Sequence, residues 1–384
     1  MNFARVFTVA QREWREILRD RIYFLLAFLL PVMLMLVFGY GMSQDIENIA
    51  FAVVDEDHTP MSRDYAHHFI ESRYFAFKGY LPNAEAADRL LAQRKLRVVI
   101  VIGPRFAEQL RTGRTAQVQT LIDGTFTTST RTIQAYVEAI NQAANAGIRT
   151  GYLARRLGLP PEQVSRLTRP VVLDVRYLYN QEVRSIWSVA PGLIMLILML
   201  VPPLLMALSV VREKETGAIY NVYSSTITRT EFLVGKLLPS VSISCINAVI
   251  LWLLATLYFG TPFKGSLAFF CVATLLYILC TTALGLLISL LVRTQQAAMI
   301  ISLVMSIIVS IQFSGLITPV SALSGGNYVI AHAFPAMYYN EVVKGAFLKA
   351  IGFAALWPQL LVFVLYAIAV FILCYLLFRK RTRT

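Results

Sequence analysis

Six long apolar runs, each free of Asp, Glu, Lys and Arg, constrain what this chain can fold into. They cover residues 22–42, 186–211, 237–259, 266–292, 296–319 and 352–378. A helix needs about 20 apolar residues to cross a hydrocarbon core about 30 Å thick. The sequence therefore predicts an α-helical polytopic membrane protein with six transmembrane helices.

The composition agrees with a membrane protein. Of the 384 residues 57% are hydrophobic and 15% are charged, whereas about a quarter of a soluble domain is charged. The net charge of +13 comes from basic residues scattered along the chain, which fits membrane topology better than a nucleic-acid site. The first run is longer than a signal-peptide core and no A-x-A-like cleavage site follows it, so we expect an uncleaved span.

The cysteines all fall inside the apolar runs, at Cys245, Cys271, Cys280 and Cys374. This placement predicts buried thiols and excludes a disulfide framework or a cysteine metal site in the polar part of the chain.

Basic residues flank the runs on one side. They gather in the segment 1–21, between the second and third runs, and in the tail 379–384. Lys and Arg stay on the cytoplasmic side of a membrane. Both termini are therefore predicted to be cytoplasmic, and the long insert 43–185 is predicted to lie outside.

The insert is long enough for a core of its own. Apolar runs rich in β-branched and aromatic residues alternate in it with helical patterns, which predicts an α/β or α+β domain. The expected strands are 49–55, 74–80, 96–102 and 116–123; the expected helices are 62–72, 83–94, one opened by Pro104, a long return over 127–157, and one starting at 160–163.

Residues 3–21 show apolar side chains at spacings of three and four, with arginines on the other face. This pattern predicts an amphipathic helix suited to a membrane surface. The alternative is an ordinary extension of the first span.

No catalytic motif is present in the sequence. It contains no GxxxxGK[ST] phosphate loop, HExxH, GxSxG or CxxC, so we expect no catalytic residue, no metal site and no ATP hydrolysis in this chain. His67 and His68 are adjacent on a predicted helix and make a poor chelate. His58 lies in an acidic stretch where a weak cation site and an ordinary turn are both open, and its neighbours are common turn residues.

The polar residues within the spans are all uncharged. Ion-coupled transporters place ionisable side chains in their spans, so their absence argues against a secondary transporter. Ser302, Ser306, Ser310 and Ser314 follow one another at helical spacing, which favours helix packing and leaves a substrate lining as the alternative. Pro202 and Pro203 remove two backbone donors and are expected to bend the second span.

The segment REKETG, residues 212–217, places four consecutive charges and a glycine between two spans. Glu213 and Glu215 do nothing for cytoplasmic retention, so the positive-inside rule alone does not account for the segment. Gly217 is able to end a helix.

Four patterns resemble one known family. They are AQREWREILRDR (10–21); FAVVDED with SRDYAHHF (51–69), together with the stretch 98–124; VVREKETGAIYNVYSSTITRTEFLVGK (210–236); and FSGLITPVSAL (313–323) with FPAMYYNEVVKGAFLK (334–349). Together they resemble the permease of ABC-2-type ABC exporters, in particular the bacterial subfamily with a large external domain after the first span. One departure is Thr226, where members often have proline.

The resemblance implies a role for several groups of residues. It assigns ATPase coupling to Arg212, Glu213, Lys214, Glu215, Thr216, Gly217, Arg229, Glu231 and Lys236. It assigns the interface helix beside the ATPase to Arg12, Glu13, Arg19 and Asp20. The possible substrate path comprises Met199, Pro202, Pro203, Gln312, Phe313 and Ser314.

The resemblance also implies partners and a location. ATP and Mg would be bound by a separate cytoplasmic ATPase subunit, and this chain would carry no cofactor. A second permease subunit, identical or a paralogue, would complete a dimer in the bacterial inner membrane, surrounded by lipid. A periplasmic adaptor protein is a further expected partner, and no nucleic acid is expected.

The predicted organisation follows. It comprises an interface helix 1–21, a first span 22–42, the external domain 43–185, five further spans within 186–378, and the basic tail 379–384. Within the spans lie a cytoplasmic coupling segment 212–236 and an external re-entrant segment 320–351. The alternative functions are an ATPase-driven mechanical transducer or a membrane sensor acting through the external domain; an enzyme fits the sequence least.

Overall fold

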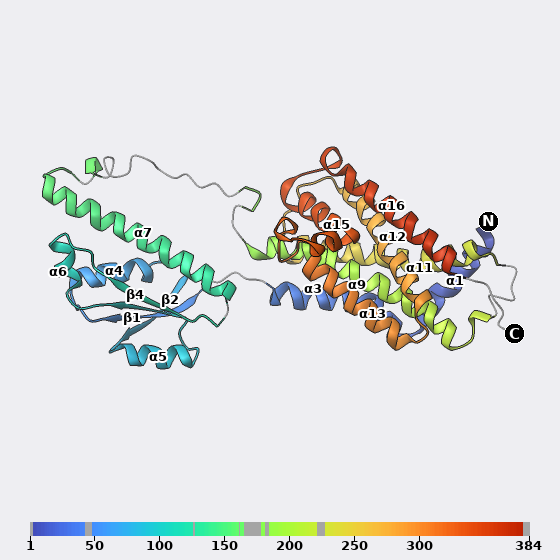
Figure 1. Ribbon diagram of the computed structural model, residues 1–384, viewed down its shortest axis with the longest axis horizontal. Helices are drawn as coiled ribbons and strands as arrows, with labels where there is room; N and C mark the ends of the chain where they lie inside the picture. Colours follow the sequence, from blue (N-terminus) through green and yellow to red (C-terminus); the bar gives the residue numbers. More distant parts are fainter. Residues whose placement is uncertain are drawn as a thin grey trace. The chain divides into compact units, whose positions relative to one another are not determined.

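The computed structural model describes residues 3–42, 48–125, 127–160, 162–164, 178–180, 184–220 and 227–378, with only the backbone at 127–129 (Figure 1). The chain forms two compact units: residues 1–43 with 177–384, and residues 44–176. The second unit is shorter than the predicted insert 43–185. Residues around Tyr179 belong with the helical unit because Lys264 Nζ donates to the Tyr179 carbonyl at 3.2 Å and Lys349 lies 5.7 Å from the Tyr179 ring centre.

The smaller unit contains a four-stranded mixed sheet. Its strands are β1 (Ile49–Asp55), β2 (Phe75–Leu81), β3 (Val98–Ile102) and β4 (Val118–Ile122), in the order β2-β1-β3-β4. Strand β1 runs parallel to β2 and β3, and β4 runs antiparallel to β3. Strands β1 and β3 are apolar along almost their whole length because helices cover both faces of the sheet.

Helices α4 (Pro60–Ile70), α6 (Phe106–Arg111) and α7 (Thr127–Leu157) lie on one face of this sheet, and α5 (Ala84–Ala92) lies on the other (Figure 1). Thr59 and Ser62 cap α4 reciprocally, and such a box satisfies backbone donors of the first turn. Alternating strands and helices, predicted from the sequence, are therefore present in this unit.

The helical unit contains six helices long and apolar enough to cross a membrane. Helix α1 (Phe3–Arg19) precedes them. The six are Arg21–Gly41 (α2, η1 and α3), α9 (Ser185–Glu215), Arg229–Tyr258 (α11 and η2), α12 (Leu267–Leu291), Gln295–Phe313 (α13 and η3) and α16 (Phe353–Leu377). The segments η1 (Leu25–Leu29), η2 (Leu254–Tyr258) and η3 (Val309–Phe313) are single π-helical turns; α2 covers Arg21–Phe24, α3 Leu30–Gly41, α11 Arg229–Leu253 and α13 Gln295–Ile308.

Helix α9 forms the centre of the bundle (Figure 1). Its apolar window is completely buried inside the unit, and a helix that is apolar on all sides is expected to lie in such a position. It continues as one helix through Pro202 and Pro203 to Glu215. Gly217 follows with φ of +75°, the left-handed conformation that glycine supplies at a helix end.

The fifth span ends at Phe313 instead of the predicted residue 319. Beyond it the backbone turns at Gly315, whose φ is +80°. Asn340 Nδ2 donates to the Ser314 carbonyl at 3.0 Å and Lys344 Nζ donates to the Gly315 carbonyl at 2.9 Å. Non-helical backbone within a bundle persists where such partners satisfy it.

The segment after this turn consists of short helices. They are η4 (Val320–Ala322), α14 (Gly326–Ala333), α15 (Pro335–Lys344) and the π-helical turn η5 (Gly345–Lys349). Helix α15 is largely buried and packs against α9. These helices lie within residues 320–351, for which the sequence predicted a re-entrant segment.

Candidate coupling site

Helix α1 packs along the first half of α11. Val6 and Ile17 are buried, and a β-carbon added at Gly235 would lie 2.8 Å from Val9 Cβ and 3.2 Å from the Val6 carbonyl. Only a glycine at 235 allows the two helices this approach. The contact places the polar side of α1 over the ends of α9 and α11.

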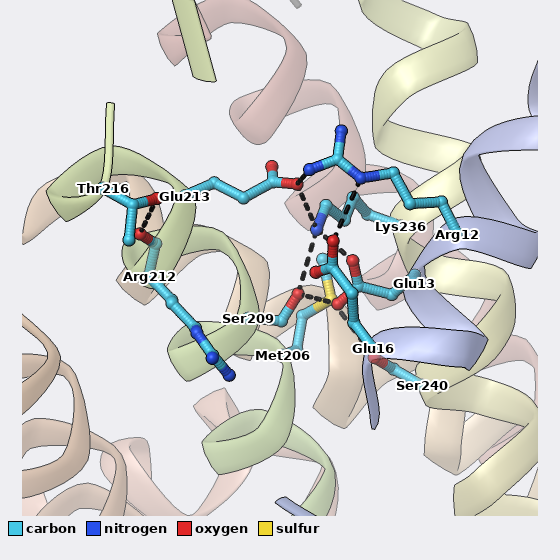
Figure 2. Close-up of polar contacts among 10 residues, drawn as sticks. All are labelled: Arg12, Glu13, Glu16, Met206, Ser209, Arg212, Glu213, Thr216, Lys236 and Ser240. Carbon is cyan, nitrogen blue, oxygen red and sulfur yellow. Dashed lines mark hydrogen bonds and ion pairs between the residues drawn. The ribbon is translucent and has the colours of Figure 1, made fainter. Parts of the chain in front are cut away.

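A buried ionic cluster joins these three helices. Glu13 from α1, Ser209 and Glu213 from α9, and Lys236 from α11 are each at least 94% buried, with exposures of 4%, 6%, 6% and 1%. Figure 2 shows the Lys236 ammonium between the two carboxylates. Lys236 Nζ contacts Glu13 Oε2, lies 3.0 Å from Glu213 Oε1 and donates to Ser209 Oγ at 3.2 Å, while Ser209 Oγ donates to Glu13.

Two carboxylates share one ammonium in this cluster. Arg12 lies at its edge, with Nη2 3.9 Å from Glu213 Oε1 and Nε donating to Glu16 at 3.0 Å. The second oxygen of Glu213 has no hydrogen-bond partner among the described residues. Burying a charge costs several kcal/mol per ion unless it is well paired. Separating the three helices would leave buried charges without partners, so the cluster holds the helices together.

Arginine 12 stays cationic beside this cluster. Burial acts to lower its pKa, but hydrogen bonding to Glu16 and the nearby charges of Glu16, Glu213 and Glu13 raise the pKa of Arg12 above its ordinary value. The carboxylates of Glu13, Glu16 and Glu213 offer oxygen atoms within 4.8 Å of one another. Three carboxylates this close could hold a metal ion. Lys236 and Arg12 already supply positive charge to balance them.

A second contact joins the start of the first span to the end of α9. Arg212 Nη1 donates to Asp20 Oδ2 at 2.6 Å, and Asp20 caps α2 by accepting from the Ile22 and Tyr23 amides. Partial burial acts to raise the pKa of Asp20, but the hydrogen bonds from Arg212 and the two amides hold it below its ordinary value. Asp20 is therefore a charged partner of α9 at neutral pH.

The remaining charges of REKETG bind the connection between α12 and α13. Lys214 Nζ donates to the carbonyls of Ser289 and Val292, the latter at 3.3 Å. Glu215 accepts from the Gln295 amide at 2.8 Å and from the Gln295 side chain. All four charged side chains of the segment thus have partners within the chain. Glu213 turns inward to meet Lys236.

Other predicted coupling residues have local roles in the structure. Glu231 and Thr228 form a capping box at the start of α11, with the Thr228 amide donating to Glu231 Oε2 at 2.9 Å. Arg5 lies 3.9 Å from the same carboxylate. Arg229 and Thr216 are exposed. Position 226, where the sequence departs from the family pattern, lies outside the described residues.

An open groove of about 460 Å³ lies above the ionic cluster. It brings together residues predicted separately for the interface helix and for the coupling segment. Its lining residues are Arg12, Glu16, Arg19, Asp20, Arg212, Glu213, Thr216 and Ala218. The groove has both signs of charge and is formed by α1 and the end of the central helix.

The residues predicted for a substrate path differ in their burial. Met199, Pro202 and Pro203 are buried inside the bundle, whereas Gln312 is exposed. Met199 meets the fifth span through its carbonyl, which accepts from Ser306 Oγ at 2.8 Å.

Serines of α13, of η3 and of the residue that follows η3 form a buried stripe facing α9. Ser302, Ser306 and Ser310 are fully buried and Ser314 is 2% exposed. The hydroxyls of Ser302 and Ser310 have no partner among the described residues. Buried hydroxyls are usually hydrogen-bonded, so these two are unusual.

Sequence reasoning missed Ser209 and Glu16, and it did not predict the pairing of Glu13 with Lys236. A signal was available in Lys236, a single lysine directly before an apolar run. Its partner lies 223 residues away, and one sequence contains no information that connects them.

A bundle with six helices long and apolar enough to cross a membrane defines the class of polytopic membrane proteins. The model of the ABC-2 family transporter protein matches residues 21–376. The chain belongs to this family and is a permease subunit of the ABC transporter type, which confirms the resemblance drawn from the sequence motifs.

Several curated proteins are similar along nearly their whole length. The probable multidrug ABC transporter permease YbhS of Escherichia coli K12 is 28% identical over 350 residues, 91% of this chain and 89% of the relative. The probable multidrug ABC transporter permease YbhR of the same organism is 26% identical over 368 residues, covering 94% and 95%. The inner membrane transport permease YhhJ of that strain is 22% identical over 395 residues, covering 100% and 99%.

Proposed function

We propose that this chain is the membrane-spanning subunit of an ATP-driven exporter and that a separate ATPase docks in the groove between α1 and the end of α9. The groove carries this proposal, because its exposed charges surround the end of the most buried helix. ATP and Mg would be held by the ATPase. Two permease subunits, identical or paralogous, would form the working unit.

The ionic cluster gives this docking site a route into the membrane. Lys236 ties α1 and α9 to α11, Lys214 ties α9 to the end of α12, and Glu215 ties α9 to the start of α13. A push on the groove would therefore move these five helices together. The ATPase would shift the bundle between two arrangements only if it bound one form of the groove more tightly than the other.

The substrate path in this proposal is the seam between α9 and α13. The unpartnered hydroxyls of Ser302 and Ser310 support it, because they gain hydrogen bonds when the seam opens to water or substrate. Met199, Pro202 and Pro203 would then form the wall on α9, and Ser314, directly after η3, would form the outer end. Phe313 and Gln312 would lie at the mouth.

The relatives' printed names support a substrate class. Two are probable multidrug permeases, so we place small hydrophobic drug-like molecules first. Both termini and the groove would face the cytoplasm, and the α/β unit would lie on the other side of a bacterial inner membrane, within reach of an adaptor protein. Phe3 and Phe7, 78% and 67% exposed on α1, would rest on lipid.

Co-purification tests the docking. The chain would be expressed with the ATPase encoded beside it, as wild type and as a variant carrying Arg19→Glu and Ala218→Trp, which reverse one charge and fill the groove. Both positions lie outside the buried cluster, so folding should be kept. We expect the variant to lose the ATPase while its elution in detergent stays unchanged.

The matched control is Arg15→Glu. It makes the same charge reversal one helical turn away, on an exposed arginine that does not line the groove, and should keep the ATPase. An ATPase that stays on the groove variant would move docking elsewhere. If wild type binds no ATPase at all, the exporter proposal fails and a sensor acting through the α/β unit becomes the better account.

A further inference from the structure

The α/β unit contains a small hollow lined by three arginines. It has a volume of about 260 Å³ and lies between α4, α6 and α7. Its lining residues are Met61, Leu110, Arg111, Ile148, Tyr152, Arg155 and Arg156. Its lining combines three guanidinium groups with apolar side chains, and no carboxylate of the described residues lines it.

The wall of this hollow is held in place. Gly113 follows α6 with φ of +74°, and a β-carbon there would lie 2.7 Å from the Tyr152 hydroxyl. The Tyr152 side chain therefore rests over the backbone at the end of α6. Arg156 Nη1 donates to the Tyr152 hydroxyl at 3.2 Å, and Arg155 Nε donates to the Gly151 carbonyl at 3.2 Å.

Most of the guanidinium donors remain available. Each arginine has five N–H donors; Arg155 and Arg156 each use one in the bonds above, and Arg111 has no ion pair or hydrogen bond to any described residue. A basic side chain near a helix C-terminus is favourable, and this accounts for Arg111 in the last turn of α6 and for Arg155 and Arg156 in the last turn of α7. It does not account for the meeting of the two helix ends at one hollow, where the three guanidiniums repel each other.

A second hollow on α6 provides an internal comparison. It shares Arg111 but is otherwise lined by Glu56, Asp57, Thr59, Arg105, Ala107, Glu108 and Thr112. Asp57 accepts from Thr59 Oγ1 at 2.6 Å and from the Ala107 amide at 3.1 Å. The first-turn amide of α6 is thus occupied by the protein's own carboxylate, and the acids make this second hollow unfavourable for an anion.

We propose that the arginine hollow binds an organic anion, a phosphate or carboxylate attached to a short aliphatic group. The charged end would bind Arg111, Arg155 and Arg156, since planar guanidiniums match these anions with paired hydrogen bonds. The aliphatic end would lie on Leu110, Ile148 and Met61. A free metabolite and the end of an anionic lipid share this chemistry.

Binding would be measured on the full chain in nanodiscs of phosphatidylcholine, with hexyl phosphate as the probe, by isothermal titration. Wild type should bind hexyl phosphate. The variant Arg155→Gln with Arg156→Gln should bind hexyl phosphate at least about tenfold more weakly. Losing one hydrogen bond to a charged group already lowers the affinity by about a factor of ten. The control Arg105→Gln, in the acidic hollow, should bind like wild type.

Three further probes, hexanol, inorganic phosphate and a short-chain anionic lipid, separate the contributions. Hexanol, which lacks the charge, should not bind measurably. Ile148→Asn should weaken hexyl phosphate and leave inorganic phosphate unchanged. Competition by monomeric dihexanoyl phosphatidylglycerol identifies the source: displacement at lower concentration than hexyl phosphate itself indicates a lipid, and weaker displacement indicates a free anion, and both support the site.

Three results would overturn the proposal. They are no binding of hexyl phosphate to wild type at millimolar concentration, equal binding by wild type and the double arginine variant, or equal binding of hexyl phosphate and hexanol. All three arginines are exposed, so the variants should fold, and unchanged thermal unfolding of the double variant would establish this.

Discussion

Lys236 provides the positive charge shared by two buried carboxylates. It is 1% exposed, and its contacts reach Glu13 on α1 and Glu213 on α9. A buried ion pair contributes little net stability compared with apolar residues, but breaking it by removing one partner is costly. Removing the charge of Lys236 while both carboxylates remain should therefore destabilise the protein.

We expect Lys236→Met to lower the free energy of unfolding by about 3–5 kcal/mol, because it leaves two buried carboxylates without their cation. The apparent unfolding temperature of the purified protein in detergent, followed by tryptophan fluorescence, measures this. Adding Glu13→Gln and Glu213→Gln should restore much of the loss, since the site is then neutral. If Lys236→Met unfolds at the same temperature as wild type, the cluster does not hold the helices together.

The pair of Asp20 and Arg212 predicts a dependence on pH. Its side chains are 25% and 44% exposed, so the pair should contribute up to about 1 kcal/mol. The pKa of Asp20 lies below the ordinary value of 3.8. Its contribution is therefore complete above pH 3.8 and is lost as the pH falls through the lower folded-state pKa.

Asp20→Asn isolates this pair because asparagine also caps helices well. The variant should unfold at a lower temperature than wild type at pH 7, and the difference should disappear as the pH falls below Asp20's folded-state pKa. A difference that persists unchanged at the lowest pH would mean that Asp20 stabilises through its cap or packing, with no share from its charge.

The residues of the groove were predictable only in part. REKETG stands out because four charges interrupt apolar sequence, and this local contrast identified one wall of the groove. Which of those charges turns inward depends on Glu13 and Lys236, both remote in the sequence. The burial of Glu213 results from tertiary contacts, and the pattern of residues along the sequence does not predict it.

At the scale of the elements, the spans were predictable because apolar length is a local property. The sequence did not predict which span lies at the centre of the bundle. The window of α16 has a higher mean hydropathy than that of α9, 3.0 against 2.7, yet 17% of it is buried compared with 100% for α9. Close helix contacts decide this, and they depend on small residues placed opposite one another.

Gly285 on α12 makes one of these contacts. A β-carbon there would lie 2.4 Å from the Pro203 carbonyl oxygen and 2.6 Å from Pro203 Cα, and backbone atoms of α9 cannot move aside as a side chain does. Gly285→Ala should therefore lower the free energy of unfolding by about 1–3 kcal/mol or more, as overpacking does. Thermal unfolding in detergent measures it.

Gly41→Ala is the matched control for this substitution. It lies in a helix of the same unit, with nothing within 4 Å of the added carbon, so the alanine should be neutral or slightly stabilising through its helix propensity. Equal effects of the two alanines would mean that α9 and α12 do not approach as closely as the structure has them.

At the scale of the whole molecule, opening between α9 and α13 would expose the serine stripe. A cysteine at 310 reports this, in a background where Cys245, Cys271, Cys280 and Cys374 are replaced by alanine. With the ATPase bound, Ser310→Cys should react slowly with a membrane-permeant maleimide at rest and several-fold faster during ATP turnover.

Thr281→Cys serves as the comparison. Thr281 is also fully buried, but it lies on α12 and its hydroxyl is satisfied by the Ile278 carbonyl at 3.1 Å. It should stay unreactive in both conditions. Equal acceleration at 281 and 310 would indicate general loosening of the bundle. No acceleration at 310 would place the moving seam elsewhere and leave the two unpartnered hydroxyls without a role in transport.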